Sequence, residues 1–161
     1  MARLAAVEAS RARFTEEKHI AALKEPLASQ GELLYRRPSH FEKITTAPIH
    51  ESLMVDGGQL SVLADGRAPV LIDLASEPEI RALVDAVRGI LSGDIAALRR
   101  SYAVSMTGPL SGWTLTLLPH EAGLSKLVRR IVVEGAGTEL HTVRIEEPTG
   151  DASLMTISPV R

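Results

Sequence analysis

Residues 76–93, SEPEIRALVDAVRGILSG, carry the clearest helical pattern in the chain. Their apolar residues recur at spacings of three and four and form one stripe: Ile80, Leu83, Val84, Val87, Ile90 and Leu91. Ser76 is the expected N-cap, with Glu79 closing a capping box, and Gly93 is the expected stop. The pattern predicts an amphipathic helix over residues 77–92 that must bury one long apolar face.

Strand patterns lie on both sides of this helix, separated by proline, glycine and Asp-Gly turns. Before the helix, strands are predicted at 15–23, 32–37, 41–46, 51–55, 59–63 and 70–74. After it, strands are predicted at 113–117, 127–134, 139–146 and 153–158. The best alternation is at 113–117, where Trp113, Leu115 and Leu117 share a face. The order predicts an antiparallel sheet interrupted by one helical insertion.

Two further helical segments are expected. Asp94 can cap a short helix through Arg99, so the helical insertion spans residues 77–100. Residues 1–13 are rich in alanine and arginine, and Leu4 and Val7 fall near one face, which predicts an N-terminal helix.

The predicted fold is α+β in a single domain over residues 1–161. About eleven antiparallel strands cannot remain flat, because strand twist accumulates and curls the sheet. We therefore expect one curved sheet, a half-open barrel, whose concave apolar face needs a cover. The helical insertion at 77–100 is the predicted lid.

The amino-acid composition and the missing motifs argue against several kinds of function. Aromatic residues make up 3% of the chain and the formal net charge is −2, so neither a base-stacking surface nor a broad polyanion-binding surface is expected. Cysteine is absent, and the five histidines form no metal-binding motif. No G-x-S-x-G motif occurs. We expect no enzyme, no metal, no cofactor and no nucleic-acid partner.

The candidate site is an apolar cavity between the sheet and the lid. The predicted sheet lining is Leu33, Tyr35, Ile44, Val55, Trp113 and Leu115, and the predicted lid contacts are Leu83, Val84, Val87 and Leu91. Arg37 shares the face of Leu33 and Tyr35, so it can bond carbonyl groups of a lid or of a ligand at the rim. Ordinary core packing of the stripe and a solvated Arg37 are the simpler alternatives.

Several segments resemble the outer-membrane lipoprotein carrier (LolA-like) proteins. They are Phe14-Thr15 at a strand, PLASQGELLYRRP at 26–38, VDGGQL at 55–60 and GWTLTLLP at 112–119. The likeness covers most of the chain, and the order and spacing of the motifs carry it. The lid region is a longer continuous helix than in the best-known carriers, and 60–63 lacks the usual aromatics.

The resemblance implies a half-open barrel closed by helices. It also implies a periplasmic protein that ferries lipoprotein acyl chains, or a related lipid, from an inner-membrane donor to an outer-membrane acceptor. Arg37 matches the Arg-Pro position, where the arginine is implied to hold the lid shut and tune release. A signal peptide is assumed to be absent from this sequence, and a monomer is expected. A lipid- or protein-binding sensor of the same fold is the alternative function.

Overall fold

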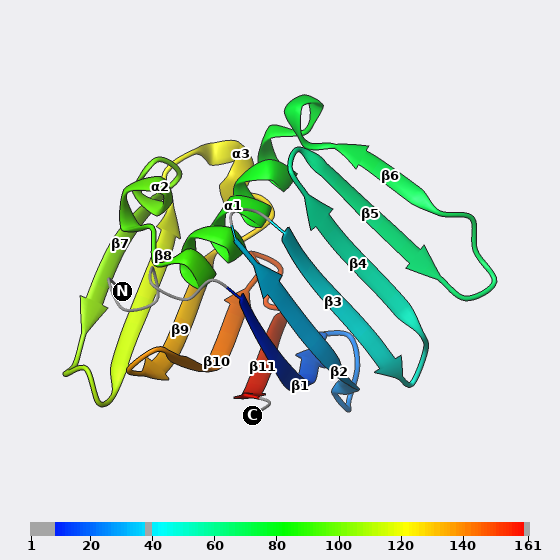
Figure 1. Ribbon diagram of the computed structural model, residues 1–161, viewed down its shortest axis with the longest axis horizontal. Coiled ribbons are helices and arrows are strands. Elements are labelled where there is room, and N and C mark those ends of the chain that lie inside the picture. The colour runs from blue at the N-terminus through cyan, green and yellow to red at the C-terminus, as the bar shows by residue number, and fades with distance from the viewer. Residues whose placement is uncertain (1–8, 38–39, 160–161) are drawn as a thin grey trace.

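The computed structural model describes residues 9–37 and 40–159, and its main element is one sheet of eleven antiparallel strands (Figure 1). The strands are β1 Ala9–His19, β2 Leu27–Arg36, β3 His40–Ala47, β4 Glu51–Asp56, β5 Gln59–Ala64, β6 Val70–Asp73, β7 Tyr102–Thr107, β8 Trp113–Pro119, β9 Arg130–Ala136, β10 Glu139–Glu146 and β11 Ala152–Pro159.

The sheet order is β6-β5-β4-β3-β2-β1-β11-β10-β9-β8-β7. Consecutive strands are neighbours except β6 and β7, and the first and last strands, β1 and β11, pair in the middle of the sheet. The two ends, β6 and β7, do not pair with each other. The sheet therefore curls without closing, which confirms the predicted half-open, largely antiparallel architecture.

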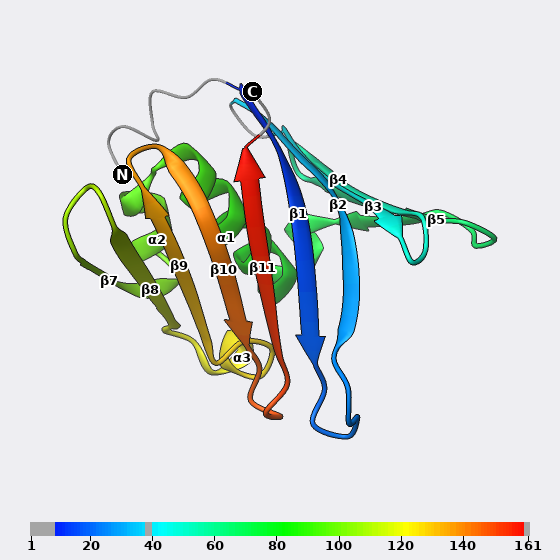
Figure 2. The ribbon, with the colours of Figure 1, turned by 90° about the horizontal axis from the view of Figure 1, so that it is seen from below.

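The segment that joins the two sheet ends is helical. It comprises a 3₁₀ turn, η2, at Leu74–Ser76, then α1 Pro78–Ser92 and α2 Ile95–Arg99. Figure 1 shows α1 running across the concave face of the sheet. Seen from below, in Figure 2, the strands lie in front and the helices behind them. A one-turn helix, α3 Ala122–Ser125, follows β8.

The ends of α1 agree only in part with the sequence prediction. Gly93 terminates the helix in the left-handed conformation, at φ 69°, as expected. The predicted capping box at Ser76 was wrong. The N-cap is Glu77, and Ser76 Oγ instead donates to the Asp73 carbonyl at 2.9 Å within the preceding 3₁₀ turn. Asp94 caps α2 as predicted, accepting from the Ala97 N–H at 3.0 Å.

The predicted N-terminal helix over 1–13 was wrong for residues 9–13, which belong to β1. Residues 1–8 lie outside the described part of the chain. β1 pairs with β2 on one side and β11 on the other. This pairing gives β1 a ladder of hydrogen bonds on each side, and Phe14 is buried, at 2% exposed. Together these contributions outweigh the helix propensity of alanine.

Other differences concern short elements. Residues 127–129 precede β9, which begins at Arg130, and Val128 is buried outside any strand. The edge strand β7 and helix α3 were not assigned from the sequence, because neither has a long enough periodic pattern. Two buried clusters fill the concave face, one over β7–β11 and one over β2–β6. Both of them meet α1.

Candidate functional site

Helix α1 occupies the concave face of the sheet and divides its apolar stripe between the two clusters. Ala86 and Ile90 are buried in the cluster over β7–β11, and Leu83 packs against it. Ile80, Val84 and Val87 pack against the cluster over β2–β6. Leu91 packs against both. A single helix therefore joins the two halves of the core, which is the position that a lid requires.

The structure separates the predicted sheet lining into two groups. Trp113 and Leu115, at 3% and 0% exposed, lie in the β7–β11 cluster. Val55 lies in the β2–β6 cluster, and Leu33 packs against it. Tyr35 is on the same face of β2 as Leu33 and is 4% exposed. These residues share the face covered by α1.

Ile44 was wrongly included in the predicted lining. In β3 it pairs with Glu32 and Ser52, and its parity is opposite to that of buried Phe41. Ile44 therefore lies on the outer face, and the concave position next to it holds Lys43. The large side chain of Phe41 fixes the register, because a slip of one residue would expose the phenyl ring.

Three side chains connect the framework around α1 to the helix. Tyr102, at the start of β7, donates a hydrogen bond from its hydroxyl to the Ala82 carbonyl at 3.0 Å. Arg37, just after β2, donates from Nη2 to the Ser92 carbonyl at 3.2 Å. Arg88 on α1 itself donates from Nη2 to the Gly57 carbonyl in the β4–β5 turn. The helix is thus held from both halves of the sheet.

Burial changes the acid–base properties of two of these groups. Burial raises the pKa of Tyr102 to about 12, and the nearby Asp85 carboxylate adds to the shift. Burial also lowers the pKa of Arg88, against the opposing effects of Asp85 and Asp56. Asp85 lies 3.8 Å from Arg88 in an ion pair on α1. Both groups keep their donor hydrogens at neutral pH.

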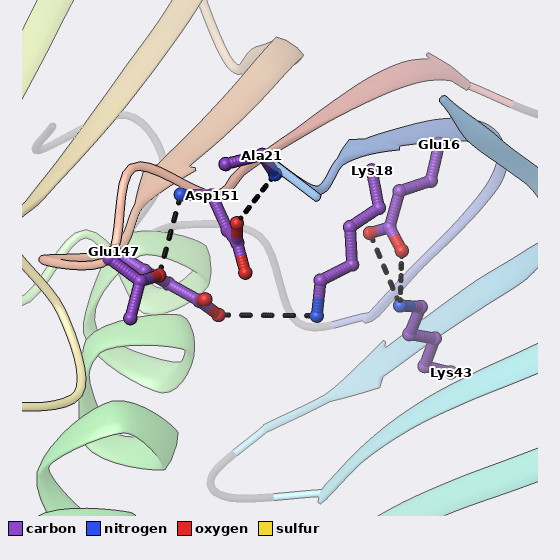
Figure 3. Close-up of polar contacts among 7 residues, drawn as sticks. Glu16, Lys18, Ala21, Lys43, Glu147 and Asp151 are labelled. Carbon is purple, nitrogen blue, oxygen red and sulfur yellow. Dashed lines mark hydrogen bonds and ion pairs between the residues drawn. The ribbon is translucent and has the colours of Figure 1, made fainter. Parts of the chain in front are cut away.

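A polar strip continues the concave face where β1 and β3 pass beyond the apolar clusters. Lys43 Nζ lies 3.3 Å from both carboxylate oxygens of Glu16 and 5.3 Å from the centroid of the Phe14 ring. Lys18 Nζ lies 4.0 Å from a carboxylate oxygen of Glu147 (Figure 3). This strip was not predicted, although the alternation of Phe14, Glu16 and Lys18 was its sequence signal.

The same region joins the two central hairpins. The Ala21 N–H, in the β1–β2 loop, donates to Asp151 Oδ1 at 2.9 Å, in the β10–β11 loop (Figure 3). This contact spans 130 residues of sequence and brings the tips of hairpins from the two halves together. The polar end of the concave face is therefore anchored, while the apolar end is covered by α1.

Pockets lie on other faces, away from the apolar face beneath α1. One of about 540 Å³ and another of about 370 Å³ adjoin each other on the outer face of β1, β2 and β11, sharing Thr15, Gln30 and Thr156. A third, of about 610 Å³, lies against the outer side of α1, where Arg81, Asp85 and Arg88 line it. Their linings are rich in polar residues, unlike the face beneath α1.

Among residues 9–37 and 40–159, no three histidine or carboxylate side chains gather as a metal site would require. The helices in this part of the chain do not reach the length and apolarity needed to cross a membrane. The concave face itself offers apolar contact from its two clusters and a few hydrogen-bond donors at its margin.

One solved structure supports the fold. A LolA superfamily protein from Nitrosomonas europaea matches 96% of this chain and 86% of its own, with a TM-score of 0.50 and 10% identity. The MucA/MucB complex of Pseudomonas aeruginosa matches 97% of this chain and 53% of its own, with a TM-score of 0.47 and 14% identity. No curated protein sequence matches this chain. The family model described as outer membrane lipoprotein carrier protein LolA-like matches residues 1–157, and the chain therefore belongs to that family.

Proposed function

We propose that this protein is a periplasmic carrier that binds the acyl chains of a lipoprotein, or of a related lipid, on the concave face of its sheet and ferries them toward the outer membrane. The observation that carries the proposal is the position of α1. One amphipathic helix packs against both clusters of the apolar face. Membership of the LolA-like family supports the same function.

The apolar face supplies the driving force for binding. Burial of an acyl chain is worth ~0.8 kcal/mol per CH₂ group, so a long chain gains ample affinity from apolar contact alone. Because α1 covers that surface in the closed protein, the chain has to take its place. Only molecules in which α1 is open can bind, so the apparent association constant is the intrinsic constant multiplied by the open fraction. Competition between helix and ligand provides a route to release.

The donor and acceptor follow from the proposed route. A carrier of this kind receives its cargo from an inner-membrane donor and passes it to an outer-membrane acceptor. Opening of α1 exposes apolar surface on both the helix and the sheet, so the open state is the one a partner protein would engage. We propose that the protein acts as a monomer, with no catalytic step.

A matched pair of variants on β2 tests the proposal. Leu33 faces α1, whereas Leu34 lies on the outer face beside Glu42, and both are half-buried. A fluorescent acyl probe is titrated into the wild type, Leu33→Glu and Leu34→Glu. We expect the first substitution to weaken binding at least about tenfold, because it places a charge among the acyl contacts, and the second to leave binding unchanged.

Mass spectrometry of lipids extracted from the purified protein identifies the cargo class. Acylated lipid in the wild type, with less in Leu33→Glu, would support the carrier function. Equal probe binding in both variants would place the ligand elsewhere. A third outcome would favour the regulatory alternative. In it, both variants still bind the probe, and the purified protein carries a partner protein but no lipid.

A further inference from the structure

The protein has two tyrosines, Tyr35 and Tyr102, and both are buried on the concave side of the sheet. Their hydroxyl groups differ. Tyr102 donates to the Ala82 carbonyl of α1 at 3.0 Å. Tyr35 is 4% exposed, and its hydroxyl oxygen has no hydrogen-bond partner within residues 9–37 and 40–159. A buried hydroxyl without a partner is disfavoured, so its retention calls for an explanation.

The position of Tyr35 places this donor within the candidate site. It lies in β2 on the same face as Leu33, and Arg37 follows two residues later, just after the strand ends. Its cross-strand neighbour is Phe41, which lies in the cluster beneath α1. Arg37 reaches the last turn of α1. Within residues 9–37 and 40–159, Tyr35 is therefore an unused donor between the apolar cluster and the polar contact that holds the helix.

We infer that the Tyr35 hydroxyl hydrogen-bonds the carbonyl oxygen of the bound acyl group, so that the site selects ester- or amide-linked acyl chains over simple alkyl chains. The inference rests on the proposed function and adds the chemical class of the ligand. When a chain replaces α1, its methylene groups contact the apolar cluster. Its carbonyl group then offers Tyr35 the acceptor that no described residue of the closed protein provides.

The Tyr35 hydroxyl therefore has opposite effects on the stability of the closed protein and on the stability of the complex. In the free protein, no described residue satisfies the hydroxyl, and replacing it with hydrogen removes an unfavourable group. In the complex, the same replacement removes a hydrogen bond from a dry environment. Tyr35→Phe is expected to leave the free protein equally or more stable while weakening acyl binding. Tyr102→Phe is expected to destabilise the free protein, because it removes a bond already made.

A pair of ligands that differ in the carbonyl group tests the inference. Monopalmitoylglycerol has an ester carbonyl, and hexadecylglycerol has an ether in its place with a chain of the same length. Displacement of a fluorescent naphthylamine probe gives the affinity of each ligand for the wild type and for Tyr35→Phe. We expect the wild type to prefer the ester by about tenfold and the variant to show almost no preference, with ether affinity unchanged.

Each outcome has one meaning. The same ester preference in both proteins would overturn the inference while leaving the carrier function intact. Binding of neither ligand by the wild type would overturn the carrier function and the inference with it. Urea unfolding of the free proteins gives a second test: a loss of stability in Tyr35→Phe as large as that in Tyr102→Phe would show that the Tyr35 hydroxyl is already satisfied, contrary to the inference.

Discussion

Arg37 and Ser92 are 55 residues apart in the chain, and the Arg37 guanidinium donates to the Ser92 carbonyl at 3.2 Å. Ser92 is the last residue of α1, where carbonyl groups lack partners within the helix and carry partial negative charge. Arg37 supplies both a donor and a positive charge. The contact ties the end of β2 to the helix that covers the concave face.

Replacement of Arg37 with leucine is expected to loosen the C-terminal turn of α1. A charge-assisted hydrogen bond of this kind contributes about 1–3 kcal/mol. Hydrogen exchange of the amides of Ile90, Leu91 and Ser92 should therefore speed up in Arg37→Leu. If α1 competes with the ligand, the same variant should bind the acyl probe more tightly and release it more slowly.

Arg36→Leu is the matched control for this substitution. Arg36 precedes Arg37 in the chain, is exposed and points to the outer face. It should leave the exchange rates of α1 and the release rate unchanged. If the amides of α1 exchange equally faster in both variants, the loss of a positive charge, and not the loss of the contact with Ser92, causes the change.

Tyr102 gives a prediction for the pH dependence of stability. Burial, with a contribution from Asp85, raises its pKa to about 12, above the ordinary tyrosine value of about 10. Between these values the folded protein holds a proton that the unfolded chain has released, so stability falls as pH rises. Tyr102→Phe should be about 1 kcal/mol less stable at neutral pH.

That difference should shrink as the pH is raised from about 10 toward 12, because the variant lacks the titrating group. Urea unfolding of the wild type and the variant at a series of pH values measures it. The difference between the two proteins removes the effect of lysine titration, which is common to both. A difference that stays constant across this range would contradict the assigned environment of Tyr102.

Gly31 is required where β2 and β3 approach most closely. A Cβ atom there would lie 1.8 Å from the Ile44 carbonyl oxygen, next to a register shift between Gln30 and Gly31. Backbone cannot yield as a flexible side chain can, so Gly31→Ala should destabilise the protein by about 3 kcal/mol. Gly58→Ala is the control, because a Cβ at Gly58 meets open space. Chemical unfolding of both variants tests this contrast.

The Glu16–Lys43 pair predicts a non-additive effect. Their side chains are 18% and 27% exposed, so neither is fully hydrated when its partner is removed. Lys43→Met alone leaves the Glu16 carboxylate unpaired beside Phe14, and Glu16→Gln alone leaves the Lys43 ammonium unpaired. A double-mutant cycle of unfolding free energies should give a coupling of about 1 kcal/mol. A coupling near zero would show that the pair is effectively solvated.

The sequence predicted most of the fold because its signals are local and strong. The stripe from Ile80 to Leu91 identified α1, and Gly93 identified its end. The alternation at Trp113, Leu115 and Leu117 placed β8 and its buried face. The strand predicted at 15–23 overlaps β1 at residues 15–19, but the first part of β1 was missed because residues 9–13 have no strong alternation of their own. Pairing with β2 and β11 decides their conformation, and no local pattern reports it.

The candidate site could be predicted where the alternation along a strand shows clearly which residues share a face. Leu33, Tyr35 and Arg37 share a face by simple alternation, and that face meets α1. Ile44 was misplaced because β3 presents an isoleucine outward and a lysine inward. The register is set by Phe41, and Glu16 of another strand compensates Lys43. The hydroxyl contact of Tyr102, and the lack of a hydroxyl partner for Tyr35 among the described residues, depend on distances across the sheet, which no sequence spacing provides.

The proposed function requires that α1 leave the concave face before an acyl chain can bind, a claim that a covalent lock on the helix can test. The chain has no cysteine, so an introduced pair can be joined selectively. Arg88→Cys on α1 and Gly58→Cys beside its contact in the β4–β5 turn are joined with a short, cleavable bis-maleimide, and acyl-probe binding is measured before and after cleavage. We predict no binding while the helix is locked and full recovery after cleavage. Equal binding in the locked and cleaved forms would contradict the claim.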